Sequence, residues 1–352
     1  MKRIKVKIYY YGSPVTLESN HFILNILKKY YEVELSDNPD YIFYNESGYE
    51  YLKYDCIRIF YTGENMTPNY NLCDYAISHD YLTFEDRHYR LPLYLITVFY
   101  NEGELELAGE NYLTKKINFT KEVLAKKTDF CSFVYSNYRA EEERKTIFEL
   151  LSKYKKVNAG GGFLNNVGGR IKNKLEFEMK HKFSIAFESS SRSGWTTEKI
   201  VSSLVAQTIP IYWGNPSIGR EFNTKRFINC HEYNSFEEVV ERIKEIDNDD
   251  ELYINMINEP INVPGYNYED VKKGFEFFLK NIIDQPIHLA KRRTINPVLE
   301  RILTKNEIIL SKYTARQSLI LKIMATIYQP FKKIPFFEKM KYSYFKKIDQ
   351  KK

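Results

Sequence analysis

The stretch "FESSSRSGWTTEKIVSSLVAQTIPIYWGNPS", from Phe187 to Ser217, decides the fold. It begins where the apolar segment "KFSIAF" ends, and its loop of small hydroxyl residues leads into "TTEKIVSSLVAQ". This segment predicts a helix with threonine near its start. "TIPIYW" then predicts a second buried strand, which ends in the loop "GNPS". A strand, a helix and a strand in this order indicate an α/β unit with a parallel sheet.

The rest of the chain extends this alternation in both directions. Upstream, strands are predicted at "IKVKIYYYG", "PDYIFYNE" and "CIRIFYTGEN", with a helical pattern in "HFILNILKKYYEVEL". A basic linker near 118–128 leads to the strand "FCSFVY" and to a second, more regular α/β unit. The chain has 352 residues and is 43% hydrophobic, so we expect two domains facing a cleft, at 1–120 and 121–295, and a tail at 296–352.

Several common site types lose their support because their motifs are missing. The 4 cysteines form no CxxC or CxxH spacing and the 6 histidines form no HExxH, so no zinc site is expected. Neither GxGxxG, GxxxxGK[ST] nor GxSxG occurs, which disfavours dinucleotide, P-loop and serine-hydrolase sites. Asp247-Asn248-Asp249 matches the DxD pattern of metal-dependent sugar transferases. It lies at the end of a predicted helix, and we interpret it as a solvated turn.

Five polar loops follow predicted strands. They are "YTGEN", "SNYRAEEER", "AGGG", "ESSSRSGW" and "GNPS". In open α/β sheets, ligands bind beyond the carboxyl ends of the strands. We therefore expect these loops to gather on one rim and to form the site.

Glu198 and Lys199 stand at the start of the predicted helix. Amide N–H groups and the helix dipole attract an anion there, such as a phosphate. Lys199 could add a full positive charge, and Glu198 could accept hydrogen bonds from ribose hydroxyls. The alternative is an ordinary capped helix with a surface Glu and Lys.

Arg144 and Glu64 are the other candidates. Arg144 lies in the first turns of the helix after "SNYRAEEER", where it could grip a diphosphate or belong to a solvated face. Glu64, in "YTGENMTPN", follows a strand and could take a proton from a hydroxyl group. The alternative interpretation is that Glu64 is a solvated carboxylate on a loop.

A long stretch of the sequence resembles a known family. "KFSIAFESSSRSGWTTEKIVSSLVAQTIPIYWGNPS" is similar to the signature of the α-1,3/4-fucosyltransferases of glycosyltransferase family 10, and to the bacterial members above all. The similarity extends to "FYTGEN", "YRLPLY", "CSFVYSN" and "IKNKLEF", so it runs from about Arg58 to Asp284.

The resemblance implies a GT-B fold, in which two Rossmann-like domains bind the acceptor and GDP-fucose respectively. It implies no required cofactor and no essential divalent metal. Glu64 matches the general base of the family, and Arg144 matches an arginine that contacts the diphosphate. The other positions implied to bind the donor are Glu188 near the fucose, Ser189, Trp195, Thr197, Glu198 on the ribose and Lys199 near the phosphate.

Two positions depart from the family pattern. Trp195 stands where a tyrosine is usual, so an indole N–H replaces a phenol hydroxyl. Ser189 stands where an asparagine is usual, and its side chain is shorter. Because neither change touches the charged residues, we expect activity to be retained.

The resemblance implies an inverting α-1,3-fucosyltransferase that moves L-fucose from GDP-β-L-fucose to the GlcNAc of a β-galactosyl-GlcNAc glycan. Such a glycan would be a Lewis-antigen-like bacterial surface polysaccharide. The alternatives are α-1,4 regiospecificity, a GT-B transferase that uses another nucleotide sugar, and a glycan-binding module without catalysis. Retention of Glu64, Arg144, Glu198 and Lys199 argues against the last of these.

The tail carries most of the excess charge of a chain whose net charge is +6. From Lys312 onward, Glu338 and Asp349 are the only acidic residues. The basic residues of this segment alternate with Phe, Tyr, Ile and Leu. Basic amphipathic segments attach to anionic membrane surfaces. We expect a cytoplasmic enzyme, peripheral at the inner face of the membrane, that binds no nucleic acid. The alternative is a helix packed on the body with a charged end.

Overall fold

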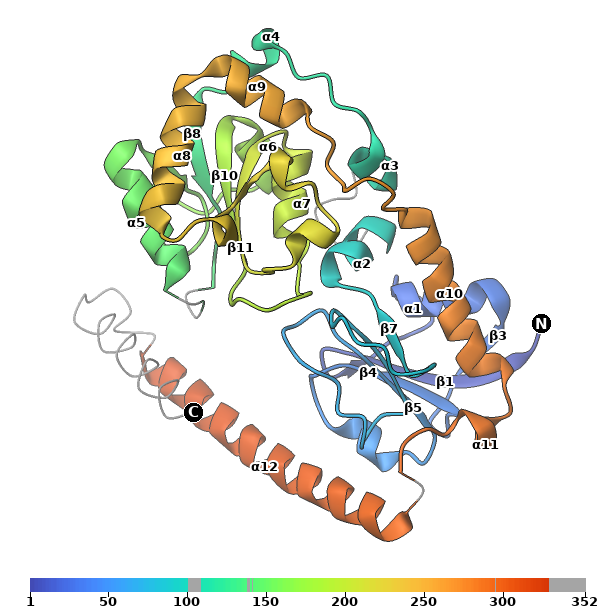
Figure 1. Cartoon of the computed structure of the whole chain (residues 1–352). Helices are drawn as coiled ribbons and strands as arrows, with labels where there is room; N and C mark the ends of the chain where they lie inside the picture. Colours follow the sequence, from blue (N-terminus) through green and yellow to red (C-terminus); the bar gives the residue numbers. More distant parts are fainter. Residues whose placement is uncertain (101–108, 138–139, 141, 295, 329–352) are drawn as a thin grey trace.

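The structure is a computed structural model that describes residues 1–100, 109–137, 140, 142–294 and 296–328. Figure 1 shows two α/β units, each built on its own sheet, and a long helix at the end of the chain. The sequence prediction of two consecutive α/β units is confirmed.

The first sheet has the strand order β2-β1-β4-β5-β6-β7, with β3 on the side of β1. Its strands pair in parallel, except that β2 pairs with β1 in the antiparallel direction. β4 is buried along its whole length, as expected for a strand of a parallel sheet that is covered on both faces. The elements of this unit are β1 (Arg3–Tyr10), β2 (Ser13–Pro14), α1 (Phe22–Tyr30), β3 (Glu32–Leu35), β4 (Tyr41–Tyr44), the 3₁₀ turn η1 (Glu50–Lys53), β5 (Ile57–Tyr61), β6 (Tyr75–Ser78), β7 (His88–Arg90) and α2 (Leu93–Tyr100).

The second sheet has the strand order β12-β11-β10-β8-β9, and all its neighbouring strands are parallel. Phe187–Ser217 supplies the end of β10, helix α7 and strand β11, as predicted. Parallel pairing brings the carboxyl ends of β8, β9, β10 and β11 to one edge, where four of the five polar loops lie. The elements are α3 (Gly109–Thr114), α4 (Lys121–Leu124), β8 (Asp129–Phe133), α5 (Glu143–Tyr154), β9 (Val157–Ala159), α6 (Lys174–Met179), β10 (His181–Phe187), α7 (Glu198–Val205), β11 (Ile209–Trp213), η2 (Ile218–Arg220), η3 (Thr224–Arg226), β12 (Ile228–Asn229), η4 (Cys230–Glu232), α8 (Phe236–Asn248) and α9 (Asp250–Asn258).

After α9 the chain returns to the first unit. Helix α10 (Tyr268–Asp284) places the Phe275 ring 6.2 Å from that of Phe22 and 5.5 Å from that of Tyr89. Its Glu276 pairs with Lys29 at 2.8 Å. α10 therefore belongs with the first sheet, although it lies within 121–295. Periodicity predicts its apolar face but not which sheet that face covers.

An ion-pair cluster fastens the chain after α10. Arg293 bonds to Asp74, whose side chain is fully buried, and to Glu300 at 2.9 Å. Arg292 pairs with Asp86 at 2.7 Å. These contacts hold α11 (Ile287–Ala290) and the start of α12 (Pro297–Tyr328) against the first unit.

The two units share an apolar core. One continuous cluster joins buried residues of the first sheet, α1 and α10 to residues of α7 and β11. Helix α2 lies at this junction: the Tyr94 ring lies 5.1 Å from that of Phe222, and the Tyr94 N–H donates to the carbonyl of Thr196 at 3.3 Å. The interface beneath the site is therefore packed.

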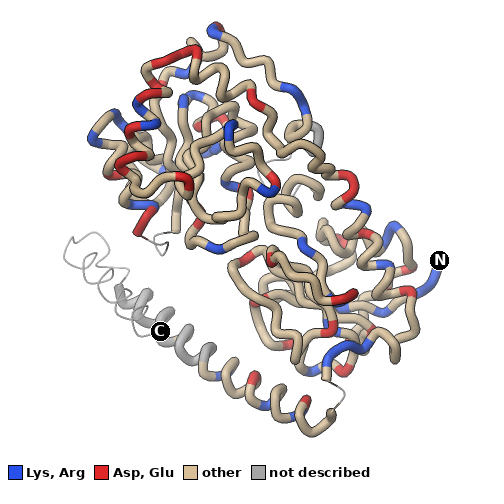
Figure 2. Tube along the Cα trace, in the orientation of Figure 1, with Lys and Arg blue, Asp and Glu red and all other residues tan. Residues whose placement is uncertain are grey.

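Helix α12 extends away from the two units (Figure 1). Leu303 packs against the first unit, while Val298, Ile309 and Tyr313 are 57–62% exposed. Figure 2 shows residues of both charge signs along its described turns. The most basic part of the predicted tail, 329–352, lies outside the described residues. In the portion of the chain that the structure covers, no helix is both long and apolar enough to cross a membrane.

Candidate active site

The candidate site lies where the loop after β5, which carries Glu64, meets the loop after β10. Four hydrogen bonds join these loops across the two units, and they involve Gly63, Asn65 and Thr67 on one side. The sequence predicts that both loops lie at strand ends, but it does not indicate that they touch. The structure thus brings Glu64 to the same place as the carboxyl edge of the second sheet.

Glu188 directly follows β10 and is fully buried. Its Oε1 accepts from the Thr197 backbone N–H at 2.8 Å, and its Oε2 accepts from the Thr197 hydroxyl at 2.7 Å. Oε2 also lies 3.1 Å from the ammonium of Lys199. A buried carboxylate needs such partners. Glu188 therefore fixes the start of α7.

Lys199 is the cation of this cluster. Its Nζ lies 3.5 Å from Glu198 Oε1 and donates to the Thr197 hydroxyl at 2.7 Å. Burial would lower the pKa of Lys199, but the charges of Glu188 and Glu198 outweigh burial and raise it. Lys199 therefore stays charged at neutral pH.

Glu198 is the first residue of α7 and stays ionised as well. Burial alone would raise the pKa of Glu198, but the charges of Lys199 and Lys174 outweigh it, so the pKa is lowered. Its side chain keeps 38% exposure, so its oxygens remain accessible to a ligand. The simple alternative of a surface Glu-Lys pair at a capped helix does not describe this buried network.

Thr197 occupies the N-cap position of α7 without a capping bond from its side chain. Its hydroxyl donates to Glu188 instead. The first N–H groups of a helix have no partner within the helix. The start of α7 can therefore offer these groups to an anion, beside the ammonium of Lys199.

Arg144, in the first turn of α5, is buried rather than solvated, with 2% exposure. Its guanidinium stacks 4.0 Å from the centre of the Tyr135 ring, and its Nη2 donates to the carbonyl of Phe187 at 3.0 Å. It therefore lies next to Glu188 at the end of β10. The Nε of Arg144 has no hydrogen-bond partner among the described residues.

The glycines of "AGGG" have a structural purpose. A side chain on Gly161 would place its Cβ 2.0 Å from the carbonyl oxygen of Tyr135. Gly161 is therefore required because its backbone closely approaches that of Tyr135, the residue on whose ring Arg144 stacks. This contact favours a structural role for the loop over close approach of its backbone to a ligand.

Glu64 is exposed, in contrast to the buried Glu188. Its backbone N–H donates to the Thr62 hydroxyl at 3.0 Å, and within the described chain its carboxylate has no hydrogen-bond partner. Partial burial raises the pKa of Glu64, and the negative charge of Glu46 adds to the rise. Smaller effects come from Lys199, which lowers the pKa, and from Glu198 and Glu188. Glu64 therefore lies within electrostatic reach of the second unit.

A cavity of about 40 Å³ adjoins Glu64 on the first unit. Tyr10, Tyr11 and Glu46 line it, together with apolar side chains of α1 and α2. Tyr10 and Tyr11 are 41% and 59% exposed. Exposed aromatic rings beside carboxylates are suited to a sugar, which has apolar C–H faces and hydroxyl groups.

Trp195 and Ser189 occupy the two positions that depart from the family pattern. Trp195 is 2% exposed, and its indole N–H donates to the carbonyl of Gly63 at 3.0 Å. Ser189 directly follows Glu188 and is partly buried. The indole N–H thus forms a hydrogen bond between the two units.

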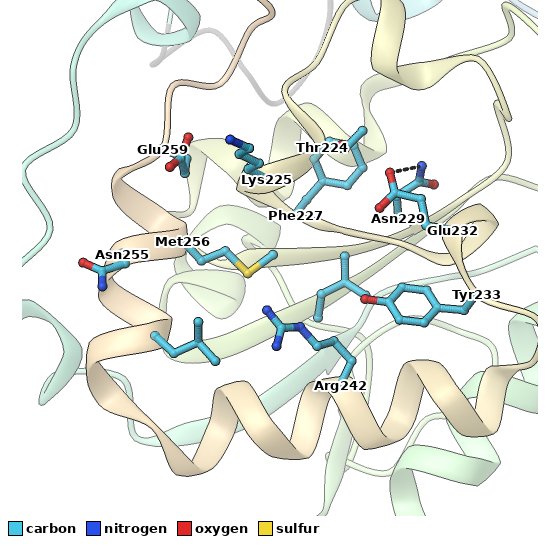
Figure 3. A pocket seen from close by; sticks show the side chains of 12 residues that line it. Thr224, Lys225, Phe227, Asn229, Glu232, Tyr233, Arg242, Asn255, Met256 and Glu259 are labelled. Carbon is cyan, nitrogen blue, oxygen red and sulfur yellow. Dashed lines mark hydrogen bonds between the residues drawn. The ribbon is translucent and has the colours of Figure 1, made fainter.

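A larger cavity, of about 330 Å³, lies elsewhere in the second unit (Figure 3). Arg242 of α8 and Met256 of α9 project into it, opposite Phe227 and Tyr233. None of its lining residues belongs to the predicted site or to the Glu64 cavity. It is a separate feature of the second unit.

The prediction that the DxD segment is a solvated turn is wrong for Asp247. Its side chain is buried and pairs with Lys182 at 2.8 Å and with Lys155. Asp249 caps α9 by accepting from the N–H groups of Glu251 and Leu252, both at 3.0 Å. Both carboxylates thus have structural partners. The four cysteines are buried and unpaired, and no cluster of potential metal ligands occurs among the described residues.

Two sequence-family models match the chain. "Alpha-(1,3)-fucosyltransferase FucT N-terminal domain" matches residues 6–100, and "Glycosyltransferase family 10 (fucosyltransferase) C-term" matches residues 124–258. The chain belongs to glycosyltransferase family 10. The resemblance that the sequence motifs suggested is confirmed.

Individual relatives agree with this assignment. The chain is 35% identical to alpha-(1,3)-fucosyltransferase FucT of Helicobacter pylori over 299 residues, which are 75% of this chain and 62% of that protein. It is 30% identical to a putative fucosyltransferase of Acanthamoeba polyphaga mimivirus, over 75% of this chain and 44% of that protein. The chain thus spans less than two thirds of the length of these relatives.

Solved structures agree as well. A crystal structure of an alpha1,3-fucosyltransferase is 30% identical with a TM-score of 0.66, over 81% of this chain and 91% of that one. A crystal structure of alpha1,3-fucosyltransferase with GDP-fucose is 28% identical with a TM-score of 0.64, over 82% and 93%. The fold of this chain is accordingly the GT-B fold.

Sequence reasoning missed three residues that build the site. Glu46 lines the Glu64 cavity and accepts from the Thr62 hydroxyl at 2.9 Å. Arg90, in "YRLPLY", and Arg192, in the loop after β10, both bond across the two units. Arg192 lies inside the signature stretch and Arg90 inside the block "YRLPLY", so the family resemblance could have drawn attention to both, whereas Glu46 lies in a segment without such a signal.

Proposed function

We propose that this chain is an inverting α-1,3-fucosyltransferase. It moves L-fucose from GDP-β-L-fucose to O3 of GlcNAc in a β-galactosyl-GlcNAc glycan, such as a Lewis-antigen-like polysaccharide of a bacterial surface. The observation that carries the proposal is that the loop of Glu64 is hydrogen-bonded to the loop that leads into the cationic start of α7. Membership of family 10 supports the choice of sugar donor.

In the proposed reaction, the donor binds at the carboxyl edge of the second sheet. Arg144, Lys199 and the N-terminus of α7 bind the diphosphate, and Glu198 accepts from the ribose. These fixed charges stabilise the negative charge that develops on GDP as the bond to fucose breaks. They would do so without a divalent metal as an essential cofactor.

The acceptor binds on the first unit, against Tyr10 and Tyr11. Glu64 takes the proton of the acceptor hydroxyl while its oxygen forms a bond to the anomeric carbon of fucose. The bond between the anomeric carbon and the phosphate oxygen breaks on the opposite side, and GDP leaves with the electron pair of that bond. Attack opposite the leaving group converts the β-linked donor into an α-linked product.

Replacement of the base tests this proposal. Glu64→Gln keeps the shape but cannot take a proton, so the transfer rate should fall by about 10²–10⁴. GDP affinity, measured by calorimetry, should remain that of the wild type, because the donor-side charges are unchanged. Glu251→Gln, an exposed change on α9, is the matched control. Transfer by Glu64→Gln at the control rate would refute the assignment of the base.

The donor and the linkage need a separate experiment. The full chain is incubated with GDP-fucose, GDP-mannose or UDP-sugars and with galactosyl-GlcNAc disaccharides of type 1 and type 2. We expect turnover with GDP-fucose and an α-1,3 linkage in the product. An α-1,4 linkage, or turnover with another nucleotide sugar alone, would select one of the alternatives.

We also propose that the tail brings the enzyme to an anionic membrane surface on the cytoplasmic side. Exposed apolar residues on α12 support this proposal, as do the basic residues that follow Lys312. Full-length protein should co-sediment with vesicles that contain anionic lipid, and a chain that ends before Lys312 should not. Equal sedimentation of the two proteins would refute the role of the tail.

A further inference from the structure

The loop formed by residues 189–195, here named the hydroxyl loop, holds the base-carrying loop on both sides of Glu64. On one side, the Trp195 indole donates to the carbonyl of Gly63 at 3.0 Å. On the other side, the amide of Asn65 donates to the hydroxyl of Ser190 at 2.7 Å. The residues immediately before and after Glu64 are therefore both bonded to the second unit.

Arg192 lies at the centre of this contact. Its Nη1 donates to Asn65 Oδ1 at 3.1 Å, and its Nη2 donates to Asp80 Oδ1 at 2.6 Å and to the Thr67 hydroxyl. The Arg192 and Asp80 side chains are 30% and 16% exposed, so water only partly screens the ion pair. One guanidinium thus joins the hydroxyl loop to two loops of the first unit.

Asp80 is held in place from its own side. The Ser78 hydroxyl donates to Asp80 Oδ2 at 2.9 Å, and the Asp80 N–H donates to the same hydroxyl at 3.2 Å. His79 lies 3.7 Å from Asp80, but burial lowers the pKa of His79 to about 4, so its ring is neutral at neutral pH. Arg90 pairs with Glu221 instead. Arg192 is therefore the cation that balances Asp80.

The approach of the two units at this point leaves no room for a side chain on Gly194. Gly194 has a φ of +85°, and an added Cβ would lie 2.4 Å from the carbonyl oxygen of His79. Its own carbonyl accepts from Arg90 Nη2 at 3.0 Å. The hydroxyl loop is therefore seated directly on the backbone of the first unit.

We propose that Arg192 is a positioning residue for the transfer reaction, which holds the Glu64 loop at a fixed place relative to the donor site. The inference rests on the proposed role of Glu64 as the base. A guanidinium suits this task because its donors are spread in a rigid plane, so that it can bond to Asn65, Thr67 and Asp80 together. An ammonium group at the same place is a point charge on a flexible stem and could not hold all three.

The test compares Arg192→Ala with Arg242→Ala in the full chain. Arg242 is a matched control, since it pairs with Glu245 on α8, away from the site. A misplacement of about 1 Å at a reacting group can cost about 10²-fold in rate, so we expect a fall in kcat of that order for Arg192→Ala. GDP affinity should stay unchanged, because the charges of Arg144 and Lys199 remain.

The acid side of the pH–rate profile separates positioning from a merely structural role. Without the Arg192 bonds to Asn65, Thr67 and Asp80, Glu64 gains water, so its raised pKa should fall and the profile should move to lower pH. Loss of folded protein alone would reduce the amplitude without moving the profile. Arg192→Lys should recover part of kcat, through its charge on Asp80. An Arg192→Ala protein with the kcat and profile of Arg242→Ala would overturn the inference.

A second variant keeps the test decisive if Arg192→Ala does not fold. Asn65→Ala removes the bonds to Arg192 and Ser190 while the Arg192–Asp80 pair remains. We expect a smaller fall in kcat, at unchanged GDP affinity, and an unaltered kcat would also overturn the inference. A wild-type chain that transfers no sugar from GDP-fucose would instead refute the proposed function itself, so the two failures are distinguishable.

Discussion

The two carboxylates on either side of the site differ in almost every physical respect. Glu188 is fully buried and bonds to Thr197 and Lys199, whereas Glu64 is exposed and its carboxylate has no hydrogen-bond partner among the described residues. Fixed, prepaired charges stabilise a charge that develops during reaction without having to reorganise. A group that must receive a proton has to be left open. The structure thus combines a rigid side around Glu188 with an accessible side around Glu64.

The largest effect is expected from removing the cation of the rigid side. Lys199→Met leaves Glu188 buried without its partner, so the free energy of unfolding should fall by about 3 kcal/mol. Transfer should fall by about 10²–10³, because the proposed mechanism assigns to Lys199 one of the charges that stabilise the departing GDP. Urea unfolding and initial rates with GDP-fucose measure the two effects.

Lys225→Met is the control for this change. Lys225 lines the separate cavity of the second unit, so its loss should leave both stability and rate unchanged. If Lys199→Met behaved like Lys225→Met, the contrast between a rigid and an accessible side would be lost.

A smaller effect is expected on the accessible side from Glu46→Gln. Burial and the Glu46 charge hold the pKa of Glu64 above its ordinary value of 4.5, so wild-type activity should be lost as pH falls through a midpoint above 4.5. Removing the like charge lowers the pKa of Glu64, and activity should then persist to lower pH. The profile of kcat/KM against pH checks this, and an acid limb that stays in place would show that Glu46 does not act on the base.

The smallest effect is expected from Trp195→Tyr, which restores the residue that is usual in the family. The change removes the indole bond to Gly63, and a neutral hydrogen bond is worth about 0.5–1.5 kcal/mol. The transfer rate should therefore fall by about 2–10-fold, with Arg192 still holding the loop. A gain in rate would mean that the phenol makes a better contact with the donor than the indole makes with Gly63.

The sequence predicted the rigid side well because that side is local. Glu188, Thr197 and Lys199 lie within one strand–loop–helix segment; the helix start indicates Lys199, and the family resemblance indicates Glu188 and Thr197. The parallel sheets also followed from the alternation of strands and helices. Each of these features depends on residues close together in the chain.

The rest depends on contacts between distant segments. Nothing in "YNES" indicates that Glu46 lies beside Glu64, and the apolar face of α10 does not reveal that it returns to the first sheet. In the sequence, Arg192 is one of several cationic residues in loops, and only the structure shows that it pairs with Asp80. Such pairings are set by how the two units dock, and a single sequence does not record that docking.

The return of the chain to its first unit has a mechanical consequence. The chain leaves the first unit after α2 and returns to it at α10, so it connects the two units twice. A body on a single tether can swivel in any direction, whereas two tethers restrict it to bending about the line that joins them. Any opening of the two units that admits or releases a nucleotide should therefore be a rotation about the single axis that joins the two connections.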